Sequence, residues 1–272
     1  MNINKTVFYL SAFLFSLVLF GCSSSELVKE ISAEEHFLKG KEYFDDESFL
    51  EAIEEFKVVG LQYSGSDFAD DAQLYLGECY FERSEYLLAA YEFEMLKKRM
   101  ASSPLVPVAQ FKIALCYYRL SPKSSLDQKN TTKAIDEFQA FLEYYPKHDS
   151  AIVAAKYIRT LNNRLAKKEY ETAKLYLTLE EYQAAQHYFE KVLERYHDTE
   201  YADDAYLGKA EVLLERKKYA EAKTMMESFY EKYPASTLRE KADTLRRDIE
   251  SIQKEKQSMD DKNPKPNQVV KE

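Results

Sequence analysis

A spaced pattern of small and large residues recurs along this 272-residue chain and limits its fold more than any other feature. In each copy a small residue is followed by a large residue three positions later and another six positions after that. An alanine and a further large apolar residue complete the copy. Copies begin at Gly40, Gly77, Ala173 and Ala210, and a copy broken by an insertion begins at Ala114. Self-similarity at a fixed spacing predicts a repeat architecture.

Each copy has the spacing of a helical hairpin. Its two small residues let a pair of helices approach closely, and its large residues fill the space around that contact. One hairpin cannot bury this face alone, so hairpins must stack. The low content of six Gly and seven Pro also favours helix. The pattern resembles the tetratricopeptide repeat (TPR) and predicts an all-α fold of about five TPR-like hairpins in a right-handed superhelix, an α-solenoid. The alternative, unrelated amphipathic helices, requires the same frame to arise repeatedly by accident.

The repeat frame also sets the expected domain boundaries. Repeats one to three are predicted in residues 33–146, with an insertion at 121–130, and repeats four and five in residues 147–250. Residues 147–172 carry a long helical pattern, which predicts an extended first helix in repeat four. The apolar periodicity is then lost, so we expect residues 251–272 to form a disordered tail.

Two similar acidic segments are predicted to begin helices. Residues 66–72 read SDFADDA and residues 199–205 read TEYADDA. A hydroxyl or carboxylate at the cap and acids in the first turn suit the unpaired N–H groups and the dipole there. Paired carboxylates can instead indicate acid–base chemistry or a metal site. We favour capping because no His or third ligand lies nearby in a matching frame.

The N-terminal segment has the pattern of a bacterial lipoprotein export signal. Lys5 precedes an apolar run from Val7 to Phe20, which is too short for a bilayer span and suits a signal peptide. The ending L-x-G-C resembles the lipobox, so residues 1–21 are predicted to be removed and Cys22 to receive a diacylglycerol and an N-acyl chain such as palmitate. Residues 22–32 would then be a tether to the membrane. The alternative is an ordinary signal peptide with an incidental cysteine.

Composition and motifs argue against several classes of function. A net charge of −9 leaves no basic stripe for a nucleic acid. The sequence has no Gly-rich phosphate loop, no H-E-x-x-H motif, no nucleophile elbow and no cluster of His residues. We therefore predict no catalytic residue, no metal site and no cofactor besides the acyl groups on Cys22. Cys79 and Cys116 occupy equivalent positions, and we favour buried thiols over a disulfide because stacked helices lie about 8–10 Å apart.

An apolar ladder on the first helix of each repeat is the candidate peptide-binding groove. Residues seven positions apart share one helix face, which in a TPR superhelix faces the concave side. In the first three repeats this ladder is largely aromatic and consists of Phe37, Phe44, Leu74, Phe81, Phe111 and Tyr118. Such a stripe suits an extended peptide with alternating apolar side chains. The alternative is that the ladder packs against neighbouring helices.

These features together resemble the BamD family of TPR lipoproteins, which assemble β-barrel proteins of the outer membrane. The most specific match is the run R-L-A-x-x-E-x-x-x-A-x-x-Y between Arg164 and Tyr176. The resemblance implies a lipid-anchored protein on the periplasmic face of the outer membrane. Ser23, which follows the cysteine, also resembles the residue found there in lipoproteins sent to the outer membrane. Its implied partners are a BamA-like barrel protein with POTRA domains and unfolded outer membrane proteins. The implied docking candidates are Arg164, Lys167, Lys168 and Tyr170.

Two other functions compete with this interpretation. Another periplasmic TPR lipoprotein scaffold could coordinate cell-wall or envelope processes, and a trimerising coiled coil before the repeats would favour it. Residues 26–36 are too short and lack heptads. A wall hydrolase with TPR appendages is the other alternative, but five repeats leave no room for a catalytic domain.

Overall fold

The computed structural model describes residues 31–262 of the chain. Those residues form eleven helices and no strand, which confirms the prediction of an all-α fold. The helices are α2 (Ala33–Asp45), α3 (Phe49–Gln62), α4 (Ala69–Glu82), α5 (Tyr86–Arg99), α6 (Val106–Leu120), α7 (Lys129–Tyr144), α8 (Ala151–Thr178), α9 (Tyr182–Arg195), α10 (Ala202–Glu215), α11 (Tyr219–Lys232) and α12 (Arg239–Lys262).

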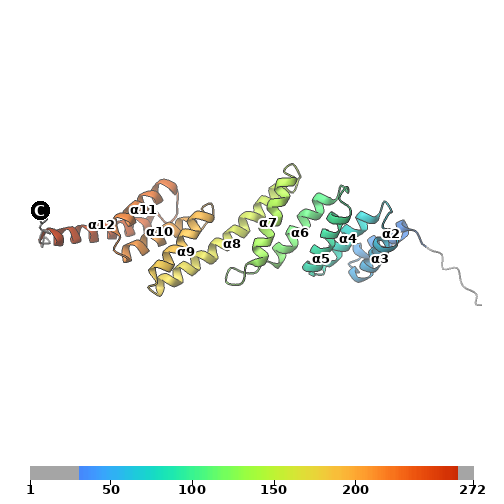
Figure 1. Ribbon diagram of the computed structural model, residues 1–272, viewed down its shortest axis with the longest axis horizontal. Coiled ribbons are helices and arrows are strands. Elements are labelled where there is room, and N and C mark those ends of the chain that lie inside the picture. The colour runs from blue at the N-terminus through green and yellow to red at the C-terminus, as the bar shows by residue number, and fades with distance from the viewer. Residues whose placement is uncertain (1–30, 263–272) are drawn as a thin grey trace, which may run out of the picture.

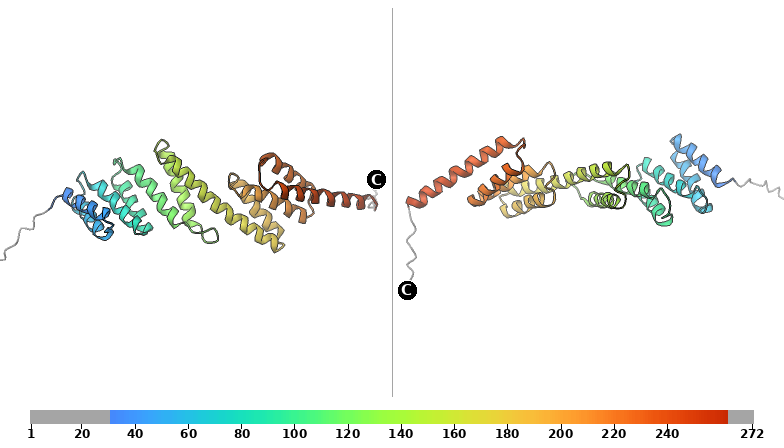
Figure 2. Two further views of the ribbon diagram at one scale, coloured as in Figure 1. Left: turned by 180° about the vertical axis from the view of Figure 1, so that it is seen from behind. Right: turned by 90° about the horizontal axis from the view of Figure 1, so that it is seen from above.

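The helices pair as successive hairpins stacked in a long row (Figure 1). Helices α2 and α3 make the first hairpin and α10 and α11 the fifth, while α12 packs on the last hairpin. The second helix of each hairpin also contacts the first helix of the next, so the core runs between hairpins along the whole row. The further views in Figure 2 show the same elongated arrangement. The predicted stack of TPR-like hairpins is confirmed.

Close contacts inside the hairpins explain the small residues of the repeat. A Cβ atom on Gly40 would lie 2.7 Å from the Phe56 ring, and one on Gly77 would lie 2.5 Å from the Phe93 ring. Both rings are almost fully buried. A third such contact joins Gly208 on α10 to the ring of Phe189 on α9. The sequence frame did not predict that contact, because Gly208 lies outside the marked positions.

The turns inside four of the hairpins contain a residue other than glycine in the left-handed region. The φ angles are 58° at Glu47, 62° at Ser84, 61° at Glu180 and 59° at Lys217. A side chain is disfavoured in this region. In the third hairpin, residues 121–128 of the insertion take the place of this turn, and residues 129–130 begin α7.

Helix α8 has 28 residues, about twice the length of the other hairpin helices. Its first half packs on α7 through buried Ala154 and Leu161, and its second half packs on α9 through Ala166 and Ala173. The first half of α8 packs on the third hairpin, and its second half forms the first helix of the fourth hairpin. An offset of about 14 residues moves the fourth hairpin about 21 Å along the axis of α8. The predicted extension of this helix is confirmed (Figure 1).

The prediction of a disordered tail from residue 251 is wrong as far as residue 262. Helix α12 continues to Lys262. Its first half is anchored by Ala242 and Ile249, which are buried in the last core cluster. Once started, a helix propagates easily through the Glu, Lys and Gln residues that follow, since no Gly or Pro interrupts them. Residues 263–272 lie outside the described residues.

The predicted caps of α4 and α10 are also wrong in part. Asp70, Asp71 and their counterparts on α10 do lie in the first turns, but neither helix has a side-chain cap. Ser66 makes no hydrogen bond through its buried hydroxyl, and Thr199 donates to the carbonyl of Tyr196 instead. The acids have another role. Ser103 donates to Asp70 at 2.5 Å and Ser236 donates to Asp203 at 2.6 Å, so each acid joins one repeat to the next.

The predicted signal peptide and Cys22 lie outside the described residues. Among the helices that the structure describes, none combines the length and the apolar character needed to cross a bilayer.

Candidate functional site

The predicted aromatic ladder lies between repeats and is not an open stripe. The Phe37 ring centroid lies 5.9 Å from that of Phe56 on its own hairpin and 5.9 Å from that of Tyr75 on the next. Phe44 contacts Tyr75 as well, at 5.3 Å. Leu74 packs against the core cluster formed by α4, α5 and α6. Each of these side chains therefore packs at the interface between neighbouring hairpins.

The rest of the ladder is packed in the same way. Phe81 is only 9% exposed and contacts Tyr86 at the start of α5. Phe111 and Tyr118 both contact Tyr157, a residue of α8, and the second pair is 4.5 Å apart. Tyr75 and Tyr157 were not singled out in the sequence. Each is the seventh residue of its helix, α4 or α8. Aligning the two helices at their first residues would have revealed this shared position.

One part of the ladder borders an open hollow between α2 and α4. The hollow has a volume of about 650 Å³, and its apolar lining includes Phe37, Phe68 and Tyr75. Its rim is acidic, with four carboxylates and one ammonium group. The rim residues are Glu42, Asp45, Asp46, Asp71 and Lys41.

The charges on this rim do not cancel. Lys41 Nζ is held 3.0 Å from the Tyr75 hydroxyl and 3.3 Å from Asp45. Burial and the neighbouring Asp70 carboxylate raise the pKa of Asp71, and the four carboxylates of the rim outnumber its one ammonium group. The hollow thus combines an aromatic floor with an anionic edge.

Partly buried polar bridges join the two helices of each of the first three hairpins. The bridges recur at equivalent positions 37 residues apart on the first helices. They join His36 to Glu55, Gln73 to Glu92, and Gln110 to Glu137, at 2.6, 2.7 and 2.8 Å. Burial opposes ionisation of Glu137, but hydrogen bonds from Lys133 and Gln110 outweigh it and lower its pKa. The pKa of Glu55 is lowered in the same way by Lys39 and His36. These polar contacts keep the hairpins in register.

Two of the four docking candidates on α8 hold the 121–130 insertion in place. Arg164 donates through Nη1 to the carbonyl oxygen of Ser121 at 2.9 Å and to its hydroxyl at 2.5 Å. Lys168 donates through Nζ to the carbonyl oxygen of Leu126 at 3.0 Å. Gln128, which is buried, donates to three loop carbonyls from inside the insertion. These hydrogen bonds hold the loop against the middle of α8.

The other two candidates differ in exposure. Tyr170 is packed between α8 and α10, where its hydroxyl donates to Asp204 at 3.3 Å. Burial and the Asp204 carboxylate raise the pKa of Tyr170. Lys167 is exposed, and its Nζ lies 3.8 Å from the Glu171 carboxylate. Lys167 and Arg164 line a cleft of about 530 Å³ between the insertion, α8 and the start of α10.

This cleft contains more positive than negative charge. Its charged lining residues are Lys123, Arg164, Lys167 and Glu200, and its polar and aromatic lining residues are Ser124, Thr160, Asn163 and Tyr201. The sequence identified the α8 residues but not Lys123 or the start of α10, because the fold alone brings these segments together.

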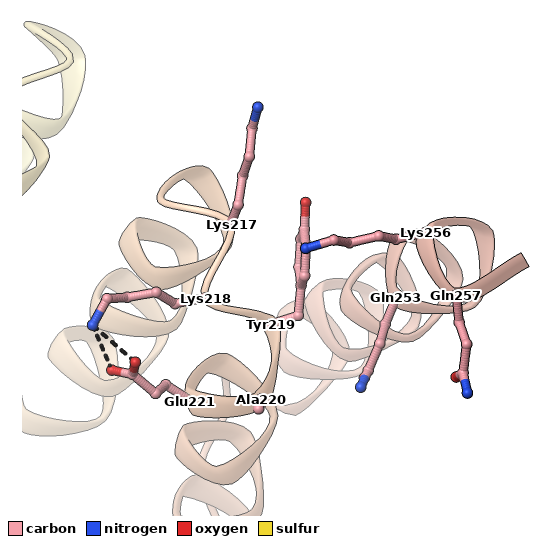
Figure 3. A pocket seen from close by; sticks show the side chains of 8 residues that line it. All are labelled: Lys217, Lys218, Tyr219, Ala220, Glu221, Gln253, Lys256 and Gln257. Carbon is pink, nitrogen blue, oxygen red and sulfur yellow. Dashed lines mark hydrogen bonds and ion pairs between the residues drawn. The ribbon is translucent and has the colours of Figure 1, made fainter. Parts of the chain in front are cut away.

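A third hollow, of about 370 Å³, lies where α12 passes the turn before α11 (Figure 3). Lys218 is paired with Glu221 at 2.8 Å, and the Lys256 ammonium lies 5.2 Å from the centre of the Tyr219 ring. Lys217 points away from the other lining residues (Figure 3). Since its cations are already partnered or turned away, this hollow has no obvious ligand.

The two cysteines of the described residues are separate buried thiols. Cys79 and Cys116 are both free and buried, and burial raises the pKa of each thiol to about 12. No group of three His, Cys, Asp or Glu residues within residues 31–262 is arranged to hold a metal ion. What the fold offers for recognition is a set of surfaces on stacked hairpins.

Comparison with known proteins gives two family matches and several similar structures. The YfiO family model, described as outer membrane lipoprotein, matches residues 29–212, and a tetratricopeptide repeat model matches residues 204–236. A TPR repeats protein from Bacteroides fragilis NCTC 9343 is similar over 81% of this chain and 99% of its own, with 12% identity and a TM-score of 0.45. The TPR2AB domain of yeast Sti1, solved as a pHSP90 complex, is similar over 83% and 86%, with 17% identity and a TM-score of 0.42. No curated protein sequence matches the chain.

Proposed function

Because this chain belongs to the YfiO family of outer membrane lipoproteins, which is the BamD family, we propose that it is a non-enzymatic scaffold for the assembly of β-barrel proteins in that membrane. The observation that carries the proposal is the extent of the family match, which runs through the first four hairpins and the start of the fifth. The match includes α8 and the insertion that it holds. A stacked array of hairpins suits the task because it presents long surfaces to several partners at once.

The cleft beside α8 is the proposed docking site for a BamA-like barrel protein with POTRA domains. Its positive lining suits an acidic loop of that partner. Lys167 is the most exposed of the four docking candidates, while Arg164 reaches the cleft and also anchors the insertion. Lys168 and Tyr170 act indirectly in this proposal, by holding the loop and α10 in position.

The hollow between α2 and α4 is the proposed contact for unfolded outer membrane proteins. An extended client strand with a terminal aromatic residue would place that ring against Phe37, Phe68 and Tyr75. The other ladder residues support this site by fixing the angle between hairpins.

Lipidation of Cys22 completes the proposal. A diacylglycerol and an N-acyl chain supply more than the two signals required for stable anchoring. The hairpins would then be tethered to the periplasmic face of the outer membrane through residues 22–32.

A pull-down from native envelopes in mild detergent tests this function. A C-terminally tagged chain is expected to recover a stoichiometric barrel protein with POTRA domains, identified by mass spectrometry. Lys167→Glu should reduce that recovery, whereas Lys156→Glu, a control on an exposed part of the same helix, should leave it unchanged. Recovery of cell-wall factors in place of a barrel protein would support the alternative, a TPR lipoprotein scaffold for envelope processes.

A further inference from the structure

Helix α5 has two apolar faces, and only one of them is used inside the protein. Ala89, Ala90, Phe93 and Leu96 are buried against α4 and α6. On the opposite side, Leu87, Leu88 and Tyr91 are 62%, 48% and 54% exposed. At 100° per residue these three side chains lie within about 100° of one another on the helix.

The repeats themselves provide a reference for this exposed face. The compared positions lie six, five and two residues before the buried large residue of each second helix. They hold Leu50, Glu51 and Glu54 on α3, Thr132, Lys133 and Asp136 on α7, Gln183, Ala184 and His187 on α9, and Ala220, Glu221 and Thr224 on α11. Each of those helices has at most one apolar residue there, whereas α5 has three. The apolar face of α5 is therefore not a requirement of the hairpin fold.

The same face becomes basic toward the end of α5. Met95 continues the apolar stripe, and Lys98 and Arg99 follow it in the last turn. Lys98 lies 2.8 Å from Glu94 and remains largely exposed, while Lys97 is turned inward and donates to Gln110. The last turn of α5 therefore has an exposed cationic end.

We propose that the exposed face of α5, formed by Leu87, Leu88, Tyr91, Lys98 and Arg99, docks on an anionic lipid surface. Leucines that enter the acyl boundary, a tyrosine at the interface and basic residues at the headgroups are the pattern of a helix lying on a membrane. The inference rests on the proposed location at the outer membrane, since a tether before α2 would keep the second hairpin near lipid. This face would be a second membrane contact besides the lipid anchor, and it would hold the first hairpins against the membrane.

A site-specific label on the full chain tests this docking. In the mature lipidated chain Leu88→Cys can be labelled selectively, because the Cys22 sulfur carries the diacylglycerol and Cys79 and Cys116 are buried thiols with pKa values raised to about 12. The matched control is Leu61→Cys, an exposed residue on α3 that is outside the proposed face. Vesicles contain phosphatidylethanolamine, phosphatidylglycerol and a nitroxide-labelled lipid that quenches the fluorophore. The label at position 88 is expected to be quenched several-fold more strongly than the label at position 61.

Charge removal adds an independent readout. The double variant Lys98→Gln and Arg99→Gln should weaken docking about thirtyfold on anionic vesicles, since each basic residue contributes about 1 kcal/mol there. It should change little on phosphatidylcholine vesicles. Equal quenching at positions 88 and 61 would overturn the inference. It would also be overturned if the label at position 88 became shielded from aqueous iodide only when envelope proteins were added, because the face would then bind a protein and not lipid. Vesicle flotation of the same samples reports anchoring through Cys22 separately, so a missing tether and a missing dock are distinguishable.

Discussion

At the scale of single residues, the contact between a glycine and an aromatic ring sets how closely the two helices of a hairpin approach. Gly40 and Gly77 each face a ring that occupies the place where their Cβ atom would stand. The rings are buried and the helix backbones are fixed by the core, so neither partner has free space to move into.

Gly77→Ala is therefore expected to lower the free energy of unfolding by about 1–3 kcal/mol, as overpacked cores do. Urea denaturation followed by circular dichroism measures it. Gly60→Ala is the matched control, because nothing lies within 4 Å of a Cβ there and Gly60 is inside α3. The free energy of unfolding of this control should rise by roughly 0.5–1 kcal/mol. Equal effects of the two substitutions would contradict the steric explanation.

The ladder residue Phe81 gives a second test at this scale. Phe81→Ala should cost about 3–5 kcal/mol of unfolding free energy because the side chain is 9% exposed and packs against Tyr86. Leu61→Ala, at an 81% exposed residue, should change stability by no more than about 0.5 kcal/mol. A Phe81 variant that kept its stability but lost peptide binding would instead indicate that Phe81 lines a peptide-binding groove.

At the scale of structural elements, the insertion and α8 behave as one unit. Arg164 and Lys168 both donate to carbonyl oxygens of the 121–130 loop, and the loop lies over the middle of α8. Because α8 packs on α7 of the third hairpin and pairs with α9 in the fourth, a contact with its middle also stiffens the joint between the two halves of the row.

Loss of this contact is measurable by hydrogen exchange. Arg164→Ala should reduce the protection of amides in residues 121–130 by roughly 10- to 100-fold, since hydrogen bonds to a charged group contribute about 1.5–3 kcal/mol. Arg159→Ala, at an exposed position on the same helix, is the control and should leave the loop protected. Unchanged protection in both variants would mean that Gln128 and its loop bonds hold the insertion without α8.

At the scale of the whole molecule, stability depends on joints repeated along the row rather than on one central core. Five separate clusters of buried side chains follow one another from the first hairpin to α12. Partly buried carboxylates bridge helices within a hairpin, as Glu55 and Glu137 do, or between hairpins, as Glu190 does, and the pKa of each is lowered.

Acid should therefore weaken the whole row. A carboxyl whose folded-state pKa is lowered stabilises the protein above its unfolded pKa, near 4.5 for Glu137, and this contribution is lost as the pH falls through the folded value. The urea midpoint is expected to drop between about pH 6 and about pH 3.5. Glu137→Gln should show a smaller drop than the parent chain. An identical drop in both proteins would show that this bridge is not among the acid-sensitive contacts.

The sequence by itself determined the hairpin fold, the number of hairpins and the extended first helix of the fourth. These features rest on local spacing: a small residue opposite a large one recurs at helical intervals, and each occurrence describes one contact between helices adjacent in the chain. The glycines at positions 40 and 77 were predictable for that reason. The end of α12 was not, because loss of apolar periodicity does not stop a helix that is already anchored.

The tertiary structure alone decided which surfaces are free. The sequence predicted the ladder on one face of each first helix, but Tyr75 and Tyr157 come from the next hairpin and contact four of its six side chains. Arg164 was identified from its motif, yet its hydrogen bonds reach a loop 43 residues away. Contacts of this kind depend on the angle between hairpins, and that angle is set by the packing of many side chains together, which no spacing within a single repeat encodes.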